Sequence, residues 1–145
     1  MSGLLRFSLR LNVPNEVERP VHPKQIEAVL ALSGPRRLEH LIKVVADREE
    51  AWGLYDDGWA LAGTDAGQEA FLLWPAEEYA ALCATDTWAN YKPKAIPLDD
   101  LVGLLLPKLQ ARGTLIAAFL TPEVAGVTLE ANHLLSMLEV ELERY

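Results

Sequence analysis

The side chains that most often perform chemistry in enzymes are scattered along this chain. The three histidines, His22, His40 and His133, are far apart, and none has another histidine or a cysteine three or four residues away, as metal ligands often do. The single cysteine, Cys83, lies on the apolar stripe of an expected helix, where it resembles a small hydrophobic residue more than a nucleophile. We therefore expect no metal site, no cofactor and no catalytic residue.

Two further features resemble catalytic motifs only in part. The adjacent carboxylates Asp56 and Asp57 would point to opposite faces of a strand, so we assign them to a turn. Ser33 precedes a Gly-Pro pair and lacks the flanking glycines of a nucleophile elbow, and no glycine-rich loop is present to hold a phosphate. The sequence leaves enzymatic activity open, but it favours a protein that is not an enzyme.

Aromatic residues gather in the middle of the chain, with lysines close by. One interpretation is a hydrophobic core, because large rings contribute most to burial. The alternative is a binding groove for a peptide or a small molecule, in which the loop residues Trp88 and Tyr91 lean over the sheet beside Trp59. Lys92 and Lys94 would flank that groove as two cations in an acidic region.

An Asp-Gly pair, Asp57 and Gly58, predicts a β-hairpin. A two-residue type I′ loop needs positive φ at both positions, which Asp tolerates and Gly adopts without steric cost. This loop would place Asp56 opposite Trp59. It would also gather four large apolar side chains on one face: Trp52, Leu54, Trp59 and Leu61.

A third strand, residues 69–74, follows a second turn and completes an antiparallel meander. Its register stays open between two loops. A two-residue loop would place Leu72 and Trp74 on the Trp59 face. A three-residue loop with Gly67 in the left-handed conformation would instead place Phe71 and Leu73 there.

Amphipathic helices surround this meander. The first should run from Pro23 to about Leu32, and the second should begin at Pro35. The second buries Leu38, Leu41, Ile42 and Val45 and leaves Arg36, Arg37, Glu39 and Lys43 outside.

A third helix should begin at Pro75, with Tyr79, Leu82 and Cys83 facing inward. A fourth helix starts near Asp99, carries Lys108 on its apolar stripe, and should kink at Pro107. A buried central strand over 114–120, an edge strand over 124–129 and a helix from about Glu130 complete the chain. We expect an α+β fold, with an antiparallel or mixed sheet built on the central three-stranded meander, preceded by two helices and covered by further helices.

The chain divides into an N-terminal arm, 1–22, and a single α+β domain, 23–145. Strict alternation from Leu5 to Val13 predicts an extra edge strand, and Pro14 and Pro20 bracket a linker. A targeting peptide is the alternative for the arm, but the period of its apolar residues is that of a strand rather than of a helix.

Composition excludes several classes of function. Half of the 145 residues are apolar, so disorder is disfavoured. With 13 basic against 21 acidic residues the chain is acidic and repels polyanions, so we expect neither nucleic acid nor membrane as partner. No apolar run approaches the roughly 18 to 20 residues that span a bilayer. One cysteine fits a reducing compartment, and we expect a cytoplasmic protein.

Several short motifs resemble a known family. They are Trp52-Gly53-Leu54, Asp57-Gly58-Trp59-Ala60, Trp74-Pro75, Glu78-Tyr79-Ala80, Tyr91-Lys92-Pro93 and Leu106-Pro107. Together they resemble a bacterial family of uncharacterised proteins known as domain of unknown function 2750, over roughly Pro23 to Tyr145. The order of elements is also similar to the N-terminal domain of SseB-like proteins. Neither resemblance implies an activity.

The leading hypothesis is a small interaction module of the adaptor, regulator or toxin-neutralising type, with another protein as partner. The alternative is a small-ligand-binding protein or cryptic enzyme that uses the aromatic groove around Trp59, Trp88 and Tyr91. A homo-oligomer stays open. Nucleic-acid binding through the basic arm is the third and least favoured hypothesis.

Overall fold

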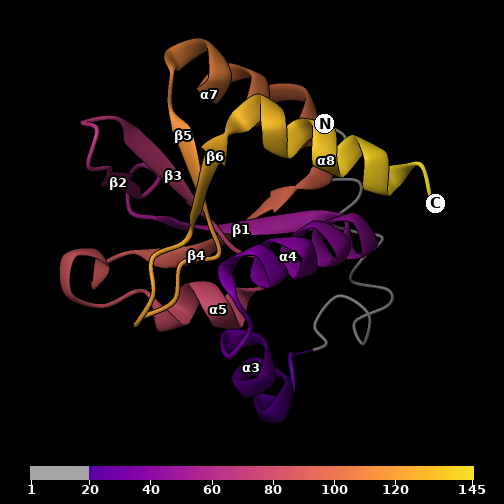
Figure 1. Ribbon diagram of the computed structural model, residues 1–145. Helices are drawn as coiled ribbons and strands as arrows, with labels where there is room; N and C mark the ends of the chain where they lie inside the picture. The colour runs from indigo at the N-terminus through magenta and orange to yellow at the C-terminus, as the bar shows by residue number, and fades with distance from the viewer. Residues whose placement is uncertain (1–19) are drawn as a thin grey trace.

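The computed structural model describes residues 20–145 and has an α+β fold, as predicted (Figure 1). The helices are α3 (Pro23–Leu30), α4 (Gly34–Arg48), α5 (Glu77–Leu82), α6 (Leu98–Asp100), α7 (Leu106–Arg112) and α8 (Ala131–Leu142). The strands are β1 (Glu50–Tyr55), β2 (Leu61–Gly63), β3 (Glu69–Leu73), β4 (Lys92–Pro97), β5 (Leu115–Ala118) and β6 (Val127–Glu130). A 3₁₀ turn (Asp86–Trp88) and a π-helical turn (Leu101–Leu105) complete the elements. The predicted arm strand from Leu5 to Val13 lies outside the described residues.

The strands form two sheets rather than one. β1 pairs with β4 in an antiparallel ribbon, while the second sheet has the order β2-β3-β5-β6, with β3 and β5 parallel. Trp52 and Trp74 join the sheets, because each backbone N–H donates to the other residue's carbonyl oxygen at 2.8 Å. The hairpin of β2 and β3 forms as predicted, but the predicted three-stranded meander is wrong. β1 pairs along its length with β4 and is connected to the second sheet through isolated bridges at Tyr55–Trp59 and Trp52–Trp74, because the chain turns away after Trp59 instead of continuing the first hairpin.

The register predicted at the first turn is wrong by one residue. Tyr55, rather than Asp56, lies opposite Trp59, so the loop has three residues and Asp57 has a φ of 57°. The Asp56 N–H donates to the Gly58 carbonyl oxygen at 2.9 Å within this loop. One extra loop residue reverses the face of every following side chain. Trp59 therefore shares a face with Tyr55, while Leu54 is fully buried on the other face.

The second turn follows the three-residue alternative. Gly67 has a φ of 84°, and Leu61 lies opposite Phe71. The Phe71 ring comes within 5.4 Å of the Trp59 ring, measured between centroids, as that loop predicted.

The first two helices form where predicted, and each begins with a side-chain cap. His22 Nδ1 accepts from the Lys24 N–H, and Ser33 Oγ accepts from the Arg36 N–H. The prediction that Arg37 lies outside is wrong, because it is only 3% exposed. Its guanidinium donates to the carbonyl oxygens of Leu32 and Phe119, at 2.6 and 3.4 Å.

The later helices differ from expectation in two details: α5 begins at Glu77 rather than at Pro75, and Leu82 does not face inward. The inward positions of Tyr79 and Cys83 are confirmed, but Leu82 is 41% exposed because the short α5 ends there. The disruption at Pro107 is confirmed: the preceding turn is π-helical, and the Leu106 N–H donates to Leu101, five residues back. Proline cannot donate a backbone hydrogen bond, and a widened turn is one way for a helix to accommodate it.

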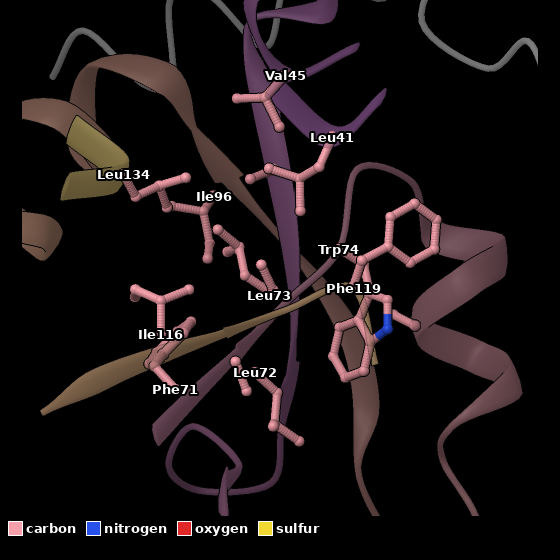
Figure 2. Packing of buried hydrophobic residues seen from close by; sticks show 14 of the residues in the cluster. Leu41, Val45, Phe71, Leu72, Leu73, Trp74, Ile96, Ile116, Phe119 and Leu134 are labelled. Carbon is pink, nitrogen blue, oxygen red and sulfur yellow. The ribbon is translucent and has the colours of Figure 1, made fainter. Parts of the chain in front are cut away.

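The core lies between the sheets and the helices that cover them (Figure 2). Its largest fully buried side chains are Trp74, Tyr79, Phe71 and Phe119. β5 lies between β3 and β6, and Ile116 and Ala117, which point to opposite faces, are both buried, so the prediction of a buried central strand is confirmed. The core interpretation therefore holds for Trp74, whereas Trp59, Trp88 and Tyr91 are only partly buried.

Candidate functional site

Trp59 is held in a box of neighbouring residues at the turn after β1. Its indole rests against Gly53, where a Cβ atom would come within 2.9 Å of ring atoms Cε3 and Cζ3. The Tyr55 ring meets it edge-on at 5.1 Å and the Phe71 ring lies at 5.4 Å, both between centroids. Contacts on several sides fix the orientation of this partly exposed indole.

Lys94 places its charge over two of these rings. Its Nζ lies 4.0 Å from the centroid of Tyr55 and 5.5 Å from that of Trp59. The strand pairing explains this position, because Lys94 lies opposite Gly53 and Lys92 lies opposite Tyr55. Residues two apart on a strand share a face, so both lysines belong to the aromatic side of the ribbon. A cation over an exposed ring contributes about 0.5–1 kcal/mol.

An open groove adjoins this cluster. We call it the Trp59–Lys94 groove; its volume is about 390 Å³. Leu104 and Leu105 of the π-helical turn and Lys108 of α7 form one wall. The other lining residues are Trp59, Lys94, Ala95, Ile96, Pro97 and Asp100. The groove thus combines apolar walls with two lysines and one carboxylate, and π-helical turns frequently occur at functional sites.

The structure separates the residues that the sequence grouped together. Trp59 and Lys94 line the groove just described, but Trp88 lines two other hollows. The larger of these has a volume of about 450 Å³ and lies on the face of the four-stranded sheet that carries Ala70 and Ala117. Tyr91 follows the turn that carries Trp88, and its N–H donates to the Trp88 carbonyl oxygen at 3.0 Å. Binding at either place stays a prediction.

Sequence reasoning missed the second wall of the groove. The helical spacing places Lys108 on the apolar stripe of its helix. A lysine among apolar positions is the signal that could have identified this wall, because its charged end must reach the surface. Leu104 is 67% exposed, which a helical pattern alone does not predict. Tyr55 was overlooked as a partner of Trp59 because the predicted register put it on the opposite face.

The ionisable groups with shifted pKa values do not line the Trp59–Lys94 groove. Burial raises the pKa of Cys83 to about 11, and a hydrogen bond with Trp74 opposes the shift. Burial, together with the nearby Glu78, raises the pKa of Tyr79 to about 12, while Arg48 opposes that shift. Burial lowers the pKa of His40. None of these groups is therefore placed to act on a ligand in that groove.

The described residues, 20–145, hold neither a cluster of metal ligands nor a helix suited to a bilayer. They contain no group of three or more His, Cys, Asp or Glu side chains arranged to hold a metal ion. None of their helices combines the length and the apolar character needed to cross a bilayer.

Comparison with known proteins gives one family. Residues 38–138 match the family described as "Protein of unknown function (DUF2750)". No curated protein and no solved structure matches the chain. The matched span includes both sheets and all of the residues that line the Trp59–Lys94 groove.

Proposed function

We propose that this chain, which belongs to the DUF2750 family of proteins of unknown function, is a non-enzymatic interaction module that binds an acidic peptide segment of a partner protein in the Trp59–Lys94 groove. It would act as an adaptor, regulator or toxin-neutralising protein in the bacterial cytoplasm. The observation that carries the proposal is the Lys94 ammonium, held over Tyr55 and Trp59 beside a groove that Lys108 also lines.

The charge of this groove differs from that of the whole chain. The chain has a net charge of −8, yet two lysines and one aspartate line the groove. A carboxylate of a partner would therefore meet a locally positive site on a molecule that otherwise repels it. Nucleic acid fits less well, because its dense phosphate charge would also meet the surrounding acidic surface.

The apolar walls supply a second element of recognition. Leu104, which is 67% exposed, and the half-buried Leu105 offer contacts to an aliphatic or aromatic side chain of the peptide. Trp59 is held by its neighbours before any ligand arrives, so binding need not order it. The preferred ligand is thus a short segment in which Asp or Glu neighbours a large apolar residue.

A displayed library of random peptides tests this specificity directly. We expect the wild-type protein to enrich acidic peptides that contain Leu, Ile or Phe. The double variant Lys94→Glu, Lys108→Glu should enrich basic peptides instead, because the sign of the groove is reversed. Lys24→Glu is the matched control, since it reverses an exposed lysine on α3, and it should enrich the same peptides as wild type.

Two results would contradict the proposal. One is a wild-type protein that enriches no common pattern. The other is a correctly folded double variant, checked by circular dichroism, that still selects the acidic peptides.

The hollow beside Trp88 favours a second function, the binding of a small apolar ligand. Its volume of about 450 Å³ falls in the range of small-molecule pockets, and alanines and glycines leave room above the sheet. A panel of apolar metabolites should quench tryptophan fluorescence in the wild type but much less in Trp88→Leu. Equal quenching in both proteins would exclude this site.

A further inference from the structure

One wall of the Trp59–Lys94 groove is a helical stretch that runs from α6 through the π-helical turn into α7, over residues 98–112. Three exposed side chains of this stretch line the groove: Asp100, Leu104 and Lys108. They occur at intervals of four residues. The wall therefore offers a carboxylate, an apolar group and an ammonium, in that order along the helix.

The π-helical turn brings these three side chains onto one side of the helix. In an uninterrupted α-helix each residue turns the chain by about 100°, so Asp100 and Lys108 would differ by about 80° around the axis. A π-helical turn contains one extra residue, which brings positions eight apart back into line. The buried side shows the same shift, because Leu101 and Leu106, five positions apart, are both 0% exposed. Asp100, Leu104 and Lys108 therefore form a row along the groove.

The spacing of this row matches an extended peptide. With a rise of about 1.5 Å per residue, Leu104 lies about 6 Å along the axis from each of Asp100 and Lys108. In an extended chain, alternate residues lie about 6.6 Å apart and point to the same face. Five residues of an extended peptide thus place their first, third and fifth side chains opposite the row.

The size of the groove disfavours a helical ligand. Side chains one turn apart on a helix also have a spacing of about 6 Å, so spacing alone does not decide between the two conformations. A helix about 10 Å across and 12 Å long occupies roughly 900 Å³. The volume of the groove is about 390 Å³, so an extended segment fits it better.

Building on the proposed function, we propose that the segment bound in the Trp59–Lys94 groove is an extended peptide with an acid, a large apolar residue and a Lys or Arg at alternate positions. The acid meets Lys108, the apolar side chain meets Leu104, and the base meets Asp100. A second acid beside the first meets Lys94. The ligand is thus acidic overall, as the charges that line the groove require, but it contains one base at a fixed position.

Nuclear magnetic resonance titrations with three capped peptides test this motif, at about 20 mM salt to limit screening. The spaced peptide is Glu-Glu-Ser-Leu-Ser-Arg, and the contiguous peptide, Ser-Glu-Glu-Leu-Arg-Ser, has the same composition. The triacidic peptide, Glu-Glu-Ser-Leu-Ser-Glu, replaces the base. We expect the wild type to bind the spaced peptide about two- to fivefold more tightly than either of the others, the range of single exposed charge pairs. The amide of Leu104 should shift on binding.

Substitution of Asp100 tests the position of the base. Asp100→Lys should reverse the preference, so that the triacidic peptide binds more tightly than the spaced one. Asp100→Asn removes the charge with little change of shape and should abolish the preference between these two peptides. Asp47→Lys is the matched control, because it changes the charge equally at an exposed aspartate of α4 outside the groove, and it should keep the wild-type preference.

The outcomes separate the motif from the proposed function. Equal affinity of the wild type for the spaced and contiguous peptides would overturn the motif but leave the binding of acidic peptides intact. The same holds if folded Asp100→Lys and Asp100→Asn, checked by circular dichroism, both keep the wild-type preference, or if Asp47→Lys reverses it. If none of the three peptides shifts the resonances of the groove, the proposed function fails together with the motif.

Discussion

Replacing Gly53 by alanine should displace Trp59. The added Cβ would lie 2.9 Å from two carbon atoms of the indole, whereas ordinary van der Waals contacts of this kind begin at 3.4 Å. The overlap is therefore about 0.5 Å. The indole cannot easily retreat, because Tyr55 and Phe71 contact it from other directions.

The expected cost follows from this overlap. Overpacking of a well-packed site costs about 1–3 kcal/mol of unfolding free energy. The positive-φ glycines are Gly58, Gly67 and Gly113 among the described residues, so backbone strain does not contribute at Gly53. Gly63→Ala is the matched control, because a Cβ there meets nothing within 4 Å. It should be neutral or stabilising by up to about 1 kcal/mol, since alanine restricts the unfolded chain.

Urea unfolding of the two variants measures the difference, which we expect to be about 1–4 kcal/mol. The indole N–H resonance of Trp59 in a ¹⁵N-correlation spectrum should also move in Gly53→Ala and stay in place in Gly63→Ala. Peptide binding should weaken only in Gly53→Ala, because Lys94 loses the ring beneath it. Equal stability of the two variants, together with an unmoved Trp59 resonance, would refute the reasoning.

Three further predictions concern buried polar groups. The Tyr79 hydroxyl has no hydrogen-bond partner within the described residues, so Tyr79→Phe should raise the unfolding free energy by about 1 kcal/mol in urea titrations. Burial raises the pKa of the Tyr79 hydroxyl from 10.0 to about 12, so the unfolded chain loses the hydroxyl proton at a lower pH than the native protein does. The wild type should therefore lose stability between pH 10 and 12, and Tyr79→Phe should lose less. The pKa of Cys83 is raised from 9.0 to about 11, so its alkylation by iodoacetamide at pH 8 should be at least about 100-fold slower in the native than in the urea-unfolded chain, and similar rates would contradict its burial. Arg37→Met leaves two carbonyl oxygens without their charged donor and should cost about 2–3 kcal/mol, whereas the exposed control Arg36→Met should stay within about 0.5 kcal/mol by thermal unfolding.

Sequence reasoning succeeded where the cause is local. The prolines near the starts of α3 and α4 and the disruption before Pro107 follow from the chemistry of a few neighbouring residues. The left-handed Gly67 was one of two predicted loops, and it placed Phe71 beside Trp59. β5 was recognised as a central strand because its apolar residues are continuous rather than alternating.

The candidate site was predicted only in part. Trp59 and Lys94 were identified from the sequence, and they do share a groove. Trp88 and Tyr91 were grouped with them by proximity along the chain, yet Trp88 lines other hollows. The one-residue error at the Asp57 turn had the largest effect, because side chains alternate between faces and a single shift exchanges Tyr55 for Leu54 beside Trp59.

By itself, the sequence determined where the helices and every strand except β4 lie, where the turns and the helix disruption lie, and that the fold is α+β. Only the tertiary structure decided that β1 pairs with β4, that Lys108 joins Lys94 across one groove, and that Arg37 is buried against Phe119. The physical reason is separation along the chain. Turn chemistry and periodicity act over a few residues, whereas these contacts depend on how complete elements pack, and Arg37 and Phe119 are 82 positions apart.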